Sequence, residues 1–214
     1  MSLYQHSAAT LDMMRLAPVI PVLTIDDPDR GVALARALVA GGLPVLEITL
    51  RTANALAAIS AICADVPGAV VGAGTILEPD HIKAAVEAGA TFLVSPGMTP
   101  KLLLAAVASP VPFLPGIATA SEAMCLMDHG FRALKFFPAE AAGGAKMLSS
   151  LAGPLGDLRF CPTGGIDAAK APGYLALKNV VCVGGSWMVP ADVSAARDYA
   201  QIEAMAREAA GIER

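Results

Sequence analysis

The chain has 214 residues, of which 55% are hydrophobic and 16% are charged, and its formal net charge is −4. This composition excludes a disordered or strongly basic chain, so we expect neither nucleic acid nor a membrane as a partner. Apolar runs stay below the roughly 20 residues of a membrane span, and residues 1–10 lack the basic-then-apolar order of a signal peptide. We therefore expect a cytoplasmic protein, and a single domain over residues 1–214 because no break in composition divides it.

Eight short apolar segments are bounded by turn-forming residues, as is typical of β-strands. They are Pro18–Thr24, Val45–Leu50, Ala69–Ala73, Thr91–Ser95, Val111–Leu114, Ala133–Phe137, Leu158–Cys161 and Val180–Val183. The segments before, between and after them carry apolar residues at helical spacing. These are Ser7–Leu16, Gly31–Ala40, Ala53–Val66, Pro79–Ala88, Pro100–Ala108, Ser121–His129, Ala141–Leu151, Ala168–Leu177 and a last helix from Ala191 to Gly211.

This alternation predicts an α/β protein, a closed (β/α)8 TIM barrel with an additional N-terminal helix. An open doubly wound sheet is the alternative. No G-x-G-x-x-G motif opens the first helix, and the second strand has polar Glu47, Thr49 and Arg51 on one face with apolar residues between them. Helices on both sides of an open sheet would leave Glu47 in a dry core, whereas a barrel can direct it toward an open mouth. The pattern therefore favours the barrel.

Lys135 lies inside an apolar strand, whereas the other five lysines lie in helical or loop contexts. A buried ammonium is costly unless it is paired or neutralised. A neutral lysine amine attacks carbonyl compounds, so Lys135 is a candidate for Schiff-base chemistry. The competing interpretation is a lysine at a strand end whose ammonium reaches water. By strand parity, Lys135 points inward with Ala133 and Phe137, while Leu134 and Phe136 face the helices.

Glu47 and Arg51 fall at the carboxyl end of their strand, where TIM-barrel enzymes build their sites. Glu47 can shuttle protons beside Lys135, and Arg51 can bind a substrate carboxylate with two hydrogen bonds. An internal ion pair of Glu47 with Lys135 or Arg51 is the purely structural alternative, although such a pair contributes little to stability.

Two glycine-rich turns predict a phosphate site. Thr163-Gly164-Gly165 follows the seventh predicted strand and Gly184-Gly185-Ser186 follows the eighth. Glycines let backbone N–H groups approach an anion, and the two hydroxyls can donate further hydrogen bonds. Phosphate sites in TIM barrels are frequently built from these two loops, so we expect a phosphorylated ligand.

The cysteines and histidines do not form a metal-binding pattern. Cys63 and Cys125 fall in helical segments, Cys161 and Cys182 fall in strands, and the three histidines are far apart in the sequence. We expect reduced cysteines in the core, with no metal and no cofactor.

Motifs along most of the chain, from about Pro18 to Ala209, resemble those of the 2-keto-3-deoxy-6-phosphogluconate (KDPG) aldolases of the Entner–Doudoroff pathway. They are Val39-Ala-Gly-Gly, Leu46-Glu-Ile-Thr-Leu-Arg-Thr, Val71-Gly-Ala-Gly-Thr, Ser95-Pro-Gly, Pro115-Gly-Ile, Lys135-Phe-Phe-Pro-Ala-Glu, Phe160-Cys-Pro-Thr-Gly-Gly-Ile and Gly184-Gly-Ser-Trp.

The resemblance implies a class I aldolase on a TIM barrel, commonly a homotrimer. Its substrate would be the phosphorylated keto-deoxy sugar acid KDPG, cleaved to pyruvate and glyceraldehyde 3-phosphate, with a side activity on 4-hydroxy-2-oxoglutarate (KHG). Lys135 would form the Schiff base and Glu47 would act as general acid and base through water. Arg51, Thr75 and Pro96 would surround the pyruvyl carboxylate, and Phe137 would contact the pyruvyl portion. The phosphate end and nearby hydroxyls would be held by Thr163, Gly164, Gly165, Gly184, Gly185 and Ser186.

Other functions remain open on the same residues. A phosphosugar isomerase or epimerase would use Glu47 as its base and Lys135 as an electrostatic group. A non-catalytic phosphosugar-binding protein would bind without turnover. Within the aldolases, the alternative substrate is the 6-phosphogalactonate epimer, and the Thr163 hydroxyl is a candidate for distinguishing the centre at which the two epimers differ.

Overall fold

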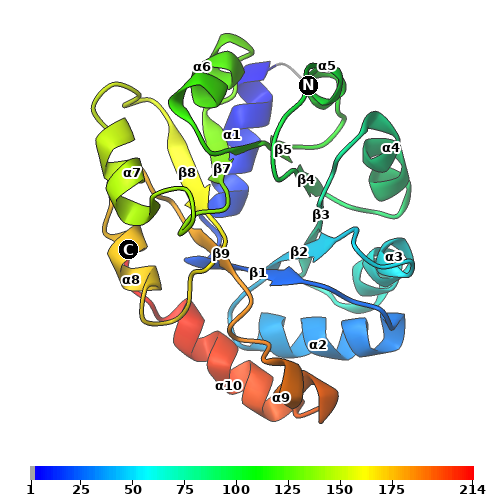
Figure 1. The fold of residues 1–214 in the computed structure, drawn as a ribbon. Helices are drawn as coiled ribbons and strands as arrows, with labels where there is room; N and C mark the ends of the chain where they lie inside the picture. The colour runs from blue at the N-terminus through cyan, green and yellow to red at the C-terminus, as the bar shows by residue number, and fades with distance from the viewer. Residues whose placement is uncertain (1–2) are drawn as a thin grey trace.

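The computed structural model describes residues 3–214 and has alternating strands and helices (Figure 1). The strands are β1 Val19–Leu23, β2 Val45–Thr49, β3 Val70–Gly74, β4 Phe92–Val94, β5 Phe113–Leu114, β6 Gly116–Ile117, β7 Ala133–Phe136, β8 Arg159–Pro162 and β9 Val183–Gly185. The helices are α1 Leu3–Met14, α2 Pro28–Ala40, α3 Ala55–Asp65, α4 Pro79–Glu87, α5 Pro100–Val107, α6 Ala120–Asp128, α7 Gly144–Leu151, α8 Ala171–Leu175, α9 Ala191–Ala195 and α10 Tyr199–Ala210.

All strand pairs formed by the described residues are parallel. One sheet has the order β5-β4-β3-β2-β1-β9 and another has the order β6-β7-β8. Isolated parallel bridges join Phe160 to Val180 and Thr163 to Gly184. Figure 1 shows α2 to α8 and α10 around the outside of the strands. The α/β class with parallel strands is confirmed.

Two apolar layers explain why helices surround the strands. An inner cluster contains Val45, Ala133, Cys161 and Cys182, and an outer cluster between strands and helices contains Leu134 and Phe136 among others. The predicted alternation of Ala133, Leu134 and Phe136 along β7 is therefore confirmed. Such alternation requires that both faces of the strands are dry, with helices covering the outer face.

Helix α1 covers the amino ends of several strands. Its Met13 and Met14 join the inner cluster. Ser7 donates to the Gly130 carbonyl at 2.8 Å and accepts from the Arg132 amide at 3.0 Å, just before β7 begins. The opposite, carboxyl ends of the strands are not covered by this helix, which leaves them available for a site.

Three predicted elements differ from the structure. The fifth predicted strand, Val111–Leu114, is shorter in the structure, where it is β5. A further short strand, β6, follows Pro115, because proline has no N–H to donate to a continuous strand ladder. The eighth predicted strand lies further along the chain as β9, which includes Gly184 and Gly185 rather than preceding them. Here Gly184 meets Thr163 so closely that a Cβ would lie 2.3 Å from the Thr163 hydroxyl oxygen.

The predicted last helix is two helices, α9 and α10. Arg197 adopts a left-handed φ of +58°, which interrupts helical geometry between them. Asp198 then begins α10 as its N-cap, and its carboxylate accepts the Gln201 amide at 3.0 Å. Aspartate is a favoured N-cap because it satisfies an amide that has no partner within the helix.

The cysteine prediction is correct in part. All four cysteines are free, and Cys161 and Cys182 are buried as expected. Cys63 and Cys125, however, are exposed, because they lie on the outward faces of α3 and α6 and not on the faces that pack on the strands. Among residues 3–214, no helix is both long enough and apolar enough to cross a membrane.

Candidate active site

Strands β2 and β7 direct Glu47 and Lys135 toward each other inside the molecule. The Lys135 Nζ lies 3.0 Å from one Glu47 carboxylate oxygen and 3.2 Å from the other. The two side chains are 6% and 5% exposed. The Lys135 ammonium also lies 5.5 Å from the centre of the Phe137 ring, within the range of a cation–π contact. The structure thus pairs a buried nucleophile with a buried proton acceptor.

Neighbouring glycines provide the space for this pair. Gly74, at the end of β3, leaves room for the carboxylate, because a Cβ there would lie 2.2 Å from the Glu47 Oε1. Gly116 is the register partner of Lys135 on β6. A Cβ on Gly116 would lie 2.3 Å from the main-chain carbon of Pro96, so the Pro96 main chain packs directly beside the strand that borders Lys135.

Arg51 is held by two threonine hydroxyls. Its Nη2 donates to Thr24 at 2.8 Å and its Nε donates to Thr49 at 3.1 Å. Thr49 in turn donates to the Leu23 carbonyl at 2.9 Å. This arrangement fixes the guanidinium in an orientation from which its remaining N–H groups can bind a carboxylate. Thr24, which ends the first predicted strand and also lines the cavity described below, is not among the predicted site residues.

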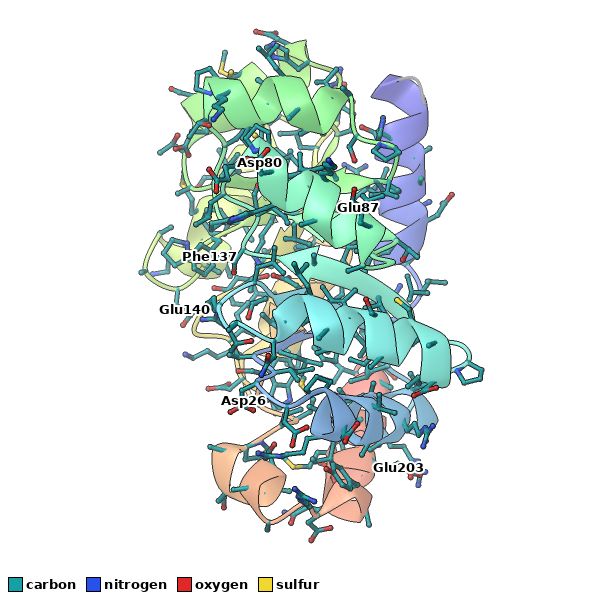
Figure 2. All side chains as sticks on the ribbon, turned by 90° about the vertical axis from the view of Figure 1, so that its right-hand side faces the viewer. Asp26, Asp80, Glu87, Phe137, Glu140 and Glu203 are labelled. Carbon is teal, nitrogen blue, oxygen red and sulfur yellow. The ribbon has the colours of Figure 1, made fainter. Side chains whose placement is uncertain are left out.

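A cavity of about 420 Å³ opens at the carboxyl ends of the strands. It collects most of the predicted binding residues, which lie in β9 or in the segments that follow β2, β7, β8 and β9. Those that line it are Arg51, Phe137, Thr163, Gly164, Gly165, Gly184, Gly185 and Ser186. Figure 2 shows Phe137 and Glu140 on one side of the molecule, with Glu87 and Glu203 on the other.

Four predicted site residues lie outside the lining of this cavity: Glu47, Thr75, Pro96 and Lys135. Glu47 and Lys135 are more deeply buried, whereas Thr75 and Pro96 are partly buried. Thr75 has a left-handed φ of +62°, an uncommon and strained conformation for a threonine. Such strain concentrates at functional sites, which fits a residue that directly follows Gly74, the glycine next to the Glu47 carboxylate.

The Thr163–Gly165 loop has positive φ angles at its two glycines. Gly164 and Gly165 have φ values of +104° and +77°, a region that favours glycine. A Cβ on Gly164 would lie 3.3 Å from the Phe137 ring, so this loop packs against the aromatic wall of the cavity. Ser186, on the facing segment after β9, is exposed to the cavity.

Behind this loop, Glu140 accepts a hydrogen bond from the Tyr174 hydroxyl and pairs with the Lys170 ammonium at 3.0 Å. The Tyr174 and Lys170 hydrogen bonds lower the pKa of Glu140. The same carboxylate raises the pKa of Lys170, while burial and the hydrogen bond to Glu140 raise the pKa of Tyr174. The network is therefore Glu140⁻, Lys170⁺ and neutral Tyr174 near neutral pH.

The buried Cys182 thiol does not offer a competing nucleophile. Cys161 is the register partner of Lys135, and Cys182 lies in the same inner cluster. Burial and a hydrogen bond with Cys161 raise the pKa of Cys182 well above its usual range, which keeps this thiol protonated. Within residues 3–214, no three side chains among histidine, cysteine, aspartate and glutamate are grouped so that they could hold a metal ion.

The fold and site define a parallel α/β protein with a buried lysine–carboxylate pair beside a glycine-lined cavity, the equipment of lysine-dependent carbonyl chemistry. The family model for KDPG and KHG aldolase matches residues 11–205. The chain belongs to this family.

Similar proteins cover nearly the whole chain. The KHG/KDPG aldolase of Escherichia coli strain K12 is 53% identical over 92% of this chain and 92% of its own length. The KDPG aldolase structure from Zymomonas mobilis ATCC 29191 has a TM-score of 0.91 and 51% identity, covering 95% of this chain and 97% of that one. The KDPG aldolase structure from Legionella pneumophila, with pyruvate captured as a covalent carbinolamine, has a TM-score of 0.92 and 41% identity, with coverages of 94% and 98%.

Proposed function

We propose that this protein is a class I aldolase that cleaves KDPG to pyruvate and glyceraldehyde 3-phosphate in the Entner–Doudoroff pathway. The observation that carries the proposal is the buried contact of 3.0 Å between the Lys135 Nζ and the Glu47 carboxylate. The names of the relatives support the substrate, and the covalent carbinolamine in the Legionella structure supports the reaction class.

The chemistry begins when Lys135 loses a proton to Glu47 and its amine attacks the C2 ketone of the substrate. The protonated Glu47 gives its proton to the carbinolamine hydroxyl, which leaves as water, so that a protonated imine and a Glu47 carboxylate remain. Glu47, acting through water, then removes the proton of the C4 hydroxyl. The C3–C4 bond breaks, its electron pair moves into the imine as an enamine, and glyceraldehyde 3-phosphate leaves. Glu47 returns a proton to C3, and water releases pyruvate and the free lysine.

The remaining site residues bind the two ends of the substrate. Arg51 binds the carboxylate, with Thr75 and Pro96 beside it, and Phe137 packs against the pyruvyl portion. The phosphate and nearby hydroxyls are held by Thr163, Gly164, Gly165, Gly184, Gly185 and Ser186. A side activity on KHG follows from the same pyruvyl end, because KHG shares the 2-oxo acid and the C4 hydroxyl with KDPG, and lacks the C5 hydroxyl and the phosphate. The KHG/KDPG name of the E. coli relative supports this side activity.

We also infer that the two sheets form one closed eight-stranded barrel with an N-terminal helix. Only Pro115 separates β5 from β6, and the Phe160–Val180 and Thr163–Gly184 bridges lie between the β8 and β9 regions. On this interpretation residues 1–214 are a single domain. The active form is a cytoplasmic homotrimer, in line with the family resemblance.

The phosphate assignment is tested by Ser186→Ala. Removing the hydroxyl should raise the KM for KDPG about tenfold, because a hydrogen bond to a charged group is lost, and should leave the KM for KHG unchanged. Pyruvate release measured with both substrates provides the comparison, and Ser150→Ala, an exposed serine on α7, is the matched control. An equal change for both substrates would contradict a phosphate site here. Failure of the unmodified enzyme to release pyruvate from either substrate would contradict the aldolase itself.

A further inference from the structure

Two carbonyls of the Gly164–Gly165 loop accept hydrogen bonds from the side that faces away from the cavity. The Gly164 carbonyl accepts the Glu140 amide at 3.1 Å, and the Gly165 carbonyl accepts the Lys170 ammonium at 2.8 Å. In a planar trans peptide the N–H points opposite to the C=O. The amides of Gly165 and Ile166 therefore project away from Glu140 and Lys170.

These two amides are available to a ligand. In the part of the chain that the structure describes, neither donates a hydrogen bond to another backbone group. Both Gly165 and Ile166 line the cavity. Unpaired backbone amides beside a cavity are costly unless water or an anion satisfies them, and convergent amides of this kind bind phosphate.

The Glu140 side chain fixes the loop by packing as well as by charge. A Cβ on Gly165 would lie 2.8 Å from the Glu140 Cγ, so the glutamate stem packs directly against the Gly165 backbone. Both carboxylate oxygens are engaged, one by Tyr174 and the other by Lys170. Tyr174 is only 2% exposed and anchors this network in the core. Glu140 cannot rotate without losing both partners.

We propose that Glu140, Lys170 and Tyr174 are positioning residues for phosphate recognition, because they orient the Gly165 and Ile166 amides toward the substrate phosphate. The proposal rests on the proposed aldolase function and adds the residues that determine its preference for a phosphorylated substrate. None of the three lines the cavity, so they act through the loop. Imine formation at Lys135, on β7, does not depend on this orientation.

The test compares Lys170→Met with the unmodified enzyme on KDPG and on KHG. The KM for KDPG should rise about tenfold because the Gly165 carbonyl loses its charged donor, with kcat within about twofold and the KM for KHG unchanged. Lys170→Arg, which keeps the charge and the donors, should recover most of the affinity. Lys101→Met, at an exposed lysine of α5, is the matched control. Tyr174→Phe should shift the KM for KDPG in the same direction, about threefold.

An unchanged KM for KDPG in both Lys170→Met and Tyr174→Phe would overturn the positioning role. An equal rise in the KM for KDPG and the KM for KHG would also overturn it, because a merely structural network affects both substrates alike. A KM for KDPG that stays high in Lys170→Arg would overturn it too, because arginine keeps the charge and the donors. Failure of the proposed function is a separate result, since it is visible in the unmodified enzyme as no pyruvate release or no selectivity for phosphate.

Discussion

The position of the Glu47 carboxylate depends on the absence of a side chain at residue 74. A Cβ on Gly74 would lie only 2.2 Å from the Glu47 Oε1, so any side chain at this position would displace the carboxylate. Thr49, two residues along β2, pairs with Gly74 in the strand register, so the glycine lies at the level of the site and not in a turn. A residue that has no side chain therefore sets the geometry of proton transfer.

Gly74→Ala should fold, because the Glu47 side chain can shift, but its carboxylate should move away from the Lys135 Nζ. A displacement of about 1 Å in a catalytic group can cost on the order of 10²-fold in rate. We expect kcat for KDPG cleavage to fall by about that factor, while borohydride trapping of pyruvate on Lys135 persists. Gly153→Ala, where a Cβ meets nothing within 4 Å, is the matched control. A Gly74→Ala enzyme with unchanged kcat would show that the carboxylate position does not limit the reaction.

For individual residues, the sequence predicts much of the geometry of the active site. Lys135 was identified from its apolar strand, and parity placed Glu47 on an inward face; the structure brings the two together. Thr24 and Lys170 were missed, because a threonine at a strand end and a lysine before a helix are ordinary surface residues. Only the packed structure shows that their partners are Arg51 and the Gly165 carbonyl.

Among the secondary-structure elements, α6 has a capping box at its start. The Thr119 hydroxyl accepts the Glu122 amide at 3.3 Å, and the Glu122 carboxylate accepts the amides of Ala118 and Thr119 at 2.8 and 2.9 Å. Burial alone would raise the pKa of Glu122, but these hydrogen bonds outweigh it and lower the pKa below its ordinary value of 4.5. The Glu122 carboxylate therefore contributes its full stabilisation above pH 4.5, and this stabilisation is lost as the pH falls through the lowered pKa.

Glu122→Ala should lower the free energy of unfolding by about 0.5–1 kcal/mol at pH 7, the usual loss for a helix cap. The difference from the unmodified protein should shrink as the pH falls through the lowered pKa of Glu122, because protonation removes the same interaction from the unmodified protein. Urea unfolding at a series of pH values provides the measurement. Glu208→Ala, at an exposed site on α10, is the control. A difference that is constant down to pH 2 would contradict the assigned role of the carboxylate.

The order of strands and helices follows from the sequence because each strand is a short apolar run between turn residues. The position of β9 does not follow, since Gly184 and Gly185 are weak strand formers in isolation. They lie in β9 because they pair with Ile20 and Pro21 of β1. Thr163 and Trp187 leave no room for side chains at these positions, which therefore require glycine. Similarly, the break between α9 and α10 depends on the backbone of Arg197, whose residue type favours a continuous helix.

For the whole molecule, we expect a mass in solution of three times the 21.7 kDa chain. Large apolar side chains such as Leu104 and Met124 are 72% and 55% exposed in the single chain, which fits a chain that associates. Sedimentation equilibrium across a range of concentrations measures this mass directly. A monomer mass at micromolar concentration would contradict the proposed homotrimer without affecting the chemistry assigned to Lys135.

The proposed mechanism requires that Lys135 forms an imine with the keto acid. The folded enzyme is incubated with excess pyruvate, reduced with borohydride, digested and analysed by peptide mass spectrometry. We predict a reduced pyruvyl adduct on the peptide that contains Lys135, and none in Lys135→Met or when pyruvate is omitted. No adduct, or an adduct on a different lysine, would contradict the Schiff-base mechanism; a complete lack of adduct would favour isomerase or epimerase chemistry with Glu47 as base.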